Sequence, residues 1–113
     1  MRHAARTDDN HAAIRDDLRR AGKGHAGAVW SVVDLSGAGN GVPDLLVGLT
    51  MRGGQRRNLL LEIKDGAKVQ SRRRLTPDQA KWHTAWRGQV AVVDSTFDAL
   101  ALIHDAIKEG GEE

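Results

Sequence analysis

Two nearly continuous apolar runs, joined by a short loop, most constrain the fold of this chain. The runs span residues 42–49 and 58–64, and the loop of residues 50–57 between them contains Gly53-Gly54. Runs of this length and composition predict two buried strands in a sheet that is covered on both faces. The glycine pair predicts that the loop closes a β-hairpin. A β-sheet is therefore expected at the centre of the fold.

Helix and strand patterns alternate on either side of this hairpin. Residues 8–21 repeat apolar side chains at helical spacing, residues 28–35 are β-branched and aromatic, and residues 36–41 form a glycine-rich loop. After the hairpin, the string Thr-Pro-Asp-Gln at residues 76–79 combines a capping box with a proline at the first helical position. It predicts the start of a helix, and residues 89–93 are then expected to form a short strand.

The resulting order, αβββαβα, predicts an α/β fold with a central mixed sheet flanked by helices. At 113 residues the chain is long enough for one domain and one core. Its last helix, from residue 95, is expected to face inward through Phe97, Leu100, Ile103 and Ile107. Residues 1–7 and 108–113 are polar and are expected to be flexible ends.

Several classes of protein are excluded by composition. The chain has no cysteine, which rules out disulfides, thiolate zinc sites and a cysteine nucleophile. It has no apolar run of membrane-spanning length and no secretory core in its first ten residues. We therefore expect a cytoplasmic protein.

Charge is unevenly distributed along the chain. Residues 52–74 carry a net charge of +6, whereas the remainder carries −4. A cluster of cations suggests a polyanionic partner, because contacts with phosphates release condensed counterions. A solvated loop with a basic bias explains the same cluster equally well.

Asp44, Glu62 and Lys64 are the residues most suggestive of chemistry. Asp44 follows Pro43 at the start of the first apolar run, and Glu62-Ile63-Lys64 ends the second. Side chains two apart in a strand share a face, so Glu62 and Lys64 are expected to point the same way. A hairpin would bring Asp44 and Glu62 close enough to hold one cation, with the backbone carbonyl of Ile63 as a further ligand.

Oxygen ligands of this kind suit Mg²⁺ or Mn²⁺, which polarise a phosphoryl oxygen and lower the pKa of a bound water. Lys64 would orient that water or stabilise the charge that grows on the phosphate. Each string also has an ordinary explanation. Pro-Asp commonly opens a turn, and Glu-x-Lys can be a surface ion pair worth about 0–1 kcal/mol. The two strings together, beside the basic segment, favour a metal-dependent nuclease.

The order of three motifs resembles the PD-(D/E)XK nuclease superfamily. These motifs are Gly-x-Pro-Asp ending at Asp44, Glu-x-Lys from Glu62 to Lys64, and Leu-Thr-x-x-Gln ending at Gln79. The chain is most similar to small stand-alone VRR-NUC (virus-type replication-repair nuclease) domains of phages, which resemble Holliday-junction resolvases. The resemblance runs from about residue 9 to residue 107 and implies a restriction-endonuclease-like core.

The resemblance implies that Asp44 and Glu62 bind metal, that Lys64 completes the active site and that Gln79 lies beside it. Helix capping alone would also explain Gln79. Many relatives have a glutamate on the first helix, where this chain has Asn10. Asn10 is either an accessory ligand, weaker than a carboxylate, or a helix cap. Asp8 or Asp9 could supply the missing carboxylate instead.

Arginines are the expected contacts to phosphate. Arg72, Arg73 and Arg74 precede the helix that carries Gln79, and Arg56 and Arg57 in the hairpin are weaker candidates. Five other side chains have ordinary explanations. His83 is expected to be packed or exposed, with the cleft as the alternative. Asp34 is expected to serve a turn, with an extra acid near the metal as the alternative. The three tryptophans are expected to lie in the core or an interface, with stacking on bases as the alternative. His11 and the remaining histidines show no spacing typical of metal ligands.

The expected function is hydrolysis of DNA phosphodiester bonds by a Mg²⁺- or Mn²⁺-dependent endonuclease. The resemblance implies that the substrate is branched DNA and that the protein acts as a homodimer. Two alternatives stay open: a nucleic-acid-binding or scaffold protein that does not cut, and a nuclease subunit that is active only with a partner.

Overall fold

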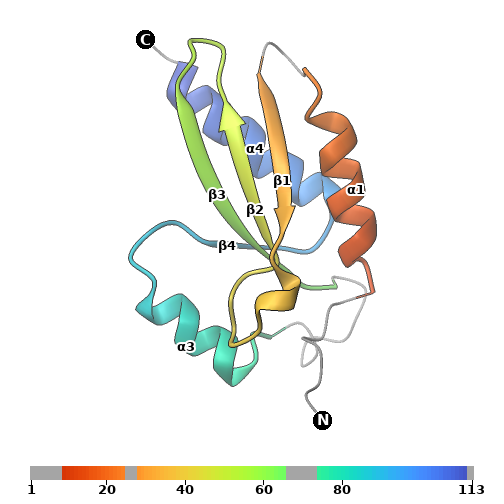
Figure 1. The fold of residues 1–113 in the computed structure, drawn as a ribbon, viewed down its shortest axis with the longest axis vertical. Coiled ribbons are helices and arrows are strands. Elements are labelled where there is room, and N and C mark those ends of the chain that lie inside the picture. Colours follow the sequence, from red (N-terminus) through yellow and green to blue (C-terminus); the bar gives the residue numbers. More distant parts are fainter. Residues whose placement is uncertain (1–8, 25–27, 66–73, 112–113) are drawn as a thin grey trace.

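The computed structural model describes residues 9–24, 28–65 and 74–111 (Figure 1). The order αβββαβα is confirmed, and so is the α/β class. The elements are α1 (His11–Ala21), β1 (Val29–Asp34), a short 3₁₀ helix η1 (Ser36–Ala38), β2 (Leu45–Thr50), β3 (Arg56–Ile63), α3 (Pro77–Ala85), β4 (Ala91–Val93) and α4 (Thr96–Gly111).

The four strands form one mixed sheet in the order β1-β2-β3-β4. β2 pairs antiparallel with both β1 and β3, whereas β4 runs parallel to β3. In the β2–β3 hairpin, Leu45 lies opposite Leu61 and Leu46 lies opposite Leu60. This register brings the start of β2 and the end of β3 to the same end of the sheet.

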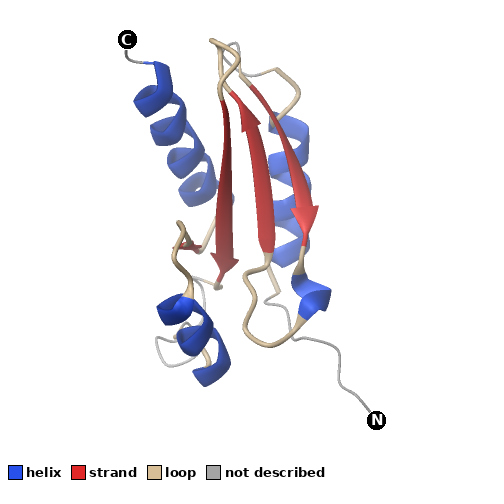
Figure 2. Ribbon diagram, turned by 60° about the vertical axis from the view of Figure 1, so that its left-hand side comes forward, coloured by secondary structure: helices blue, strands red, loops and turns tan. Residues whose placement is uncertain are grey.

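The core lies between the sheet and two of the helices. Ile14 of α1 and Ile103 of α4 join Val47 and Leu61 in one buried cluster. Both helices therefore cover the same face of the sheet, the face on which alternate residues of β2 and β3 are buried. α3 lies beyond the end of the sheet in two different views (Figures 1 and 2).

The second face of β1 is open in the described part of this chain. Val29 and Val33, which point away from the core, are 47% and 50% exposed. β1 is therefore covered on one face only, whereas the residues of β2 that point away from the core are half-buried. Continuous apolar runs indicate buried strands, but they do not say which element, if any, covers each face.

The last helix differs from the prediction in the face that it buries. Phe97 is 83% exposed, so its expected inward position is wrong. Ala99, Ile103 and Ala106 are the buried residues, and the two alanines leave room for close approach to the sheet. Leu100 and Ile107 lie at the margin of the core. The helix continues to Gly111, beyond residue 108, where the sequence predicted a flexible end. None of the described helices has the length and apolarity needed to cross a membrane.

Candidate active site at the end of the sheet

Asp44 and Glu62 meet where β2 begins and β3 ends. Leu45 lies opposite Leu61, so one further step of the register places Asp44 opposite Glu62. Asp44 Oδ2 accepts a hydrogen bond of 2.8 Å from the backbone N–H of Ile63. The Asp44 carboxylate therefore lies against the peptide bond that joins Glu62 to Ile63.

Three charged side chains are buried at this end of the sheet. Asp44 is 8% exposed, Glu62 is 0% and Lys64 is 7%. Burying a charge is unfavourable unless other groups compensate for the lost water. The backbone of Lys64 is held from both sides, because its N–H donates to Val93 and its carbonyl oxygen accepts from Asn10. These two hydrogen bonds fix the backbone position from which the Lys64 side chain extends.

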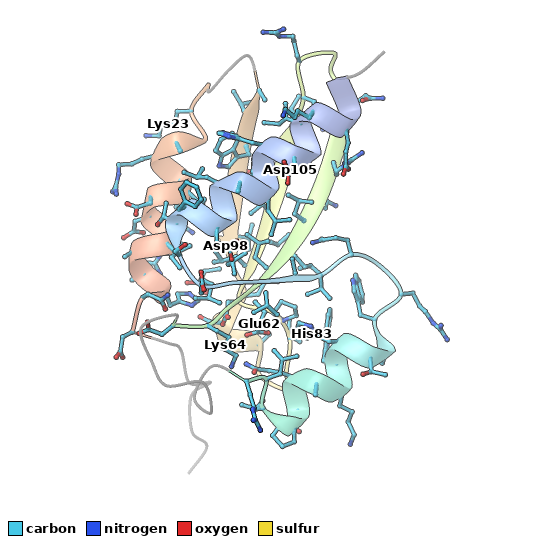
Figure 3. The ribbon with its side chains drawn as sticks, turned by 180° about the vertical axis from the view of Figure 1, so that it is seen from behind. Lys23, Glu62, Lys64, His83, Asp98 and Asp105 are labelled. Carbon is cyan, nitrogen blue, oxygen red and sulfur yellow. The ribbon has the colours of Figure 1, made fainter. Side chains whose placement is uncertain are left out.

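α3 supplies two polar contacts to Glu62. Gln79 Nε2 donates to Glu62 Oε2 at 3.0 Å, and His83 Nε2 lies 3.4 Å from Glu62 Oε1. Glu62, Lys64 and His83 lie together beside α3 (Figure 3). Gln79 also completes a capping box with Thr76, since its Oε1 accepts from the backbone N–H of Thr76. Gln79 therefore caps α3 and also lies beside Glu62.

His83 belongs to this cluster, although the sequence favoured a side chain that is simply packed or exposed. Burial lowers the pKa of His83, and the positive charge of Lys64 lowers it further. The imidazole is therefore neutral at neutral pH, where it can donate one proton to Glu62. Its position one turn after Gln79 was the only signal in the sequence, because side chains four apart share a helix face.

Asn10 connects the ends of three elements. It occupies the position before α1, but its side chain makes no capping bond to the helix. Instead, its Nδ2 donates to the carbonyl oxygen of Lys64 at 3.3 Å and to that of Asp94 at 3.1 Å. Asn10 Oδ1 is buried and has no hydrogen-bond partner. Of the two expectations, side-chain capping is thus wrong, and the free oxygen lies close to the candidate site.

His11 is a second residue that sequence reasoning missed. It is only 4% exposed and lies between two acids. Its Nε2 is 3.1 Å from Asp34 Oδ2, and its Nδ1 is 3.7 Å from Asp44 Oδ1. Asp34 is 23 positions from His11 and Asp44 is 33 positions away. No local spacing could therefore have revealed the group.

Asp34 is held as a carboxylate by several donors. Burial alone would raise the pKa of Asp34, but hydrogen bonds from the Ser36 side chain, the Ser36 backbone, Arg15 and His11 lower it well below its usual range. The Arg15 and Ser36 side-chain bonds measure 2.9 Å and 2.6 Å. Asp34 therefore serves the turn after β1, as expected, and also faces His11.

The donor set at the end of the sheet suits a hard divalent cation. Asp44 and Glu62 offer carboxylates, and the Ile63 carbonyl faces the same edge as its N–H, which bonds to Asp44. Mg²⁺ typically binds through one or two carboxylates and keeps several waters. Within the described ranges, no three His, Cys, Asp or Glu side chains already converge on one point. Water and phosphate would thus complete the shell of a bound ion.

The expected phosphate contacts are spread over the molecule. Arg72 and Arg73 lie outside the described residues, and Arg74 is exposed just before α3. Arg56 and Arg57 begin β3, about 20 Å from Glu62 at the rise of an extended strand. Arg57 also pairs with Glu109 of α4 at 2.9 Å. Arg74 is therefore the best placed of the described candidates.

The tryptophans divide into two groups. Trp30 is buried and donates from its Nε1 to the carbonyl oxygen of Leu18, as a core residue would. Trp82 and Trp86 stack on each other at the other end of the molecule, with ring centroids 4.9 Å apart. Trp86 is 44% exposed, so this pair is outside the core.

Comparison with protein-family models, with curated proteins and with solved structures found no match to this chain. A function therefore has to be argued from the residues that the fold brings together.

Proposed function

We propose that this protein is a divalent-metal-dependent endonuclease that hydrolyses DNA phosphodiester bonds. The proposal is carried by one observation: the Asp44 carboxylate bonds to the N–H of Ile63, between Glu62 and Lys64, at a buried end of the sheet. Apolar side chains would fill this space at a lower free-energy cost than two acids and a lysine, so packing alone does not explain these three residues.

Asp44, Glu62 and the Ile63 carbonyl would hold Mg²⁺ or Mn²⁺. The ion, when bound, would polarise a phosphoryl oxygen and lower the pKa of a coordinated water. Lys64 would place its ammonium group beside the phosphate and offset the negative charge that develops there. Gln79 and neutral His83 donate toward Glu62 and so fix the direction in which its carboxylate points.

DNA would be held through its backbone by the basic segment. Residues 52–74 carry the net charge of +6, and Arg74 leads directly into the helix that contacts Glu62. Contacts with phosphate position a protein on DNA without reading sequence. Branched DNA as the substrate and a homodimer as the active form are the finer parts of this proposal, which the motif resemblance supports. We also propose a cytoplasmic location.

One observation favours a protein that binds DNA without cutting it. Both oxygens of Glu62 already face partners on α3, so a cation would have to share this carboxylate with Gln79 and His83. The same contacts of Glu62 with α3 are expected in a nuclease that cuts only after a partner protein activates it. Activity measurements separate these alternatives from the main proposal.

The test is cleavage of a supercoiled plasmid and a four-way junction with Mg²⁺, with Mn²⁺ and with EDTA. Glu62→Gln removes a charge without removing volume, and Glu109→Gln makes the same change at an exposed position of α4. We expect E62Q to lower the cleavage rate by about 100-fold or more while E109Q retains it, since lost electrostatic stabilisation typically costs this much. DNA binding should persist in both variants.

Cutting that continues in EDTA, or that is equal in E62Q and E109Q, would contradict the proposed site. DNA binding by the wild-type protein with no cutting under any metal condition would support the non-cleaving alternative. Cleavage of the junction with the plasmid left intact would support branched DNA as the substrate.

A further inference from the structure

The imidazole of His11 is buried between two carboxylates, but only one of them is within hydrogen-bond distance. Nε2 lies 3.1 Å from Asp34 Oδ2, whereas Nδ1 lies 3.7 Å from Asp44 Oδ1. The second distance is too long for a hydrogen bond, and Nδ1 has no other hydrogen-bond partner. A buried ring nitrogen in this condition is unfavourable unless something else binds it.

The surroundings of Asp34 identify which nitrogen carries the proton. Asp34 Oδ2 also accepts from Arg15 Nη1 at 2.9 Å, and Asp34 Oδ1 accepts from the backbone N–H and the hydroxyl of Ser36. A carboxylate with these donors acts only as an acceptor, so Nε2 of His11 must be the N–H. In the neutral ring, Nδ1 then carries a lone pair and lies 3.7 Å from Asp44 Oδ1.

A lone pair beside a carboxylate oxygen is repulsive without a cation between them. The separation of 3.7 Å between Nδ1 and Oδ1 leaves room for one metal ion with bonds of about 2.0–2.2 Å to each atom. Asp34 would then complete a familiar arrangement, in which a metal-binding histidine donates its other N–H to a carboxylate that fixes the ring.

We propose that His11 is a ligand of the cation that Asp44 holds. The site would then have one nitrogen donor in addition to its oxygen donors. Imidazole binds transition-metal ions in preference to Mg²⁺, so the ion of this site would be a divalent transition metal, with Mn²⁺ as the experimental probe. This inference rests on the cation site of the proposed function, but not on DNA cleavage.

The direct test is pulsed electron paramagnetic resonance of Mn²⁺ bound to the wild-type protein, without DNA. A nitrogen ligand couples to the electron spin of Mn²⁺, and replacing natural histidine with ¹⁵N-histidine must change that coupling. His11→Gln should abolish the coupling, whereas His104→Gln should retain it. His104 is the comparison because it is on the exposed side of α4.

Binding titrations give a second readout. We expect His11→Gln to weaken Mn²⁺ binding by about tenfold or more and to change Mg²⁺ binding, measured by competition, much less. Asp34→Asn should weaken Mn²⁺ binding by about tenfold, since carboxylates behind a ligating histidine typically contribute this much. His104→Gln should match the wild-type protein.

Bound Mn²⁺ with no nitrogen coupling in the wild-type protein would overturn the inference. Equal loss of Mn²⁺ and Mg²⁺ in His11→Gln would also overturn it. The two proposals fail separately: cleavage without nitrogen coupling would remove only this inference, and nitrogen coupling without cleavage would remove only the nuclease.

Discussion

Asp34 illustrates how one residue can be set by contacts from several elements. Arg15 and His11 of α1 and Ser36 of the following 3₁₀ helix all donate to it. These donors lower the pKa of Asp34 despite its burial. The stability that the Asp34 carboxylate contributes is therefore fully present above the unfolded-state pKa of about 3.9, and it is lost as the pH falls through the native-state pKa.

We therefore expect the metal-free protein to lose stability below about pH 4 in part through protonation of Asp34. Asp34→Asn should be less stable than the wild-type protein at pH 7, and its melting temperature should fall less between pH 5 and pH 3. Thermal denaturation in EDTA measures both effects. Asp105→Asn, at an exposed position of α4, is the control, and an identical acid response in the two variants would contradict this role of Asp34.

Each site residue that the sequence predicted belongs to a short local motif. Asp44 follows a proline, Glu62 and Lys64 are two apart, and Gln79 belongs to a capping box. His11 has no such motif. Its partners come from the end of β1 and the start of β2, so its role depends on tertiary packing of α1 against the sheet.

At the scale of elements, α3 is attached in an unusual way. None of its residues is buried, and it is held to the rest of the molecule by the contacts of Gln79 and His83 with Glu62. The loop before β2 also touches its first turn. Gly41 has φ +82°, and a Cβ there would lie 2.2 Å from the carbonyl oxygen of Asp78.

Gly41→Ala should therefore displace α3 from the end of the sheet. The left-handed backbone alone costs about 1–2 kcal/mol for a residue with a side chain, and the clash with Asp78 adds to it. Chemical denaturation measures the free energy of unfolding, and amide hydrogen exchange reports on α3 itself.

Gly53→Ala is the matched control for this substitution. Gly53 lies in the hairpin loop with nothing within 4 Å of the added Cβ, so a change within about 0.5 kcal/mol is expected. Equal destabilisation of the two variants, or normal protection of α3 in Gly41→Ala, would show that the close approach does not hold this helix.

At the scale of the whole molecule, the core depends on one face of α4. Ile103→Ala should lower the free energy of unfolding by about 2–5 kcal/mol, because Ile103 is fully buried against the sheet. Phe97→Ala, on the same helix, should change it by no more than about 0.5 kcal/mol, since Phe97 is 83% exposed. Urea denaturation of both variants checks the comparison, and a large loss at Phe97 would be contrary to the arrangement of α4.

Element order was predictable because each element carries a local pattern of its own. The apolar runs gave β2 and β3, and the capping box gave the start of α3. The inward face of α4 was not predictable in the same way. Phe97 is apolar and correctly spaced, but Ala99 and Ala106 allow closer contact with the sheet, and that advantage exists only after folding. The open face of β1 was unpredictable for a similar reason, because tertiary packing decides which element covers each face of a strand.

The distribution of the tryptophans gives the protein two separate optical reporters. Trp30 is enclosed by apolar side chains, so its fluorescence would be blue-shifted and would follow unfolding of the core. Trp82 and Trp86 are stacked near the candidate site, where their emission would be red-shifted and their electronic transitions coupled. Events at α3 could thus be observed without any added dye.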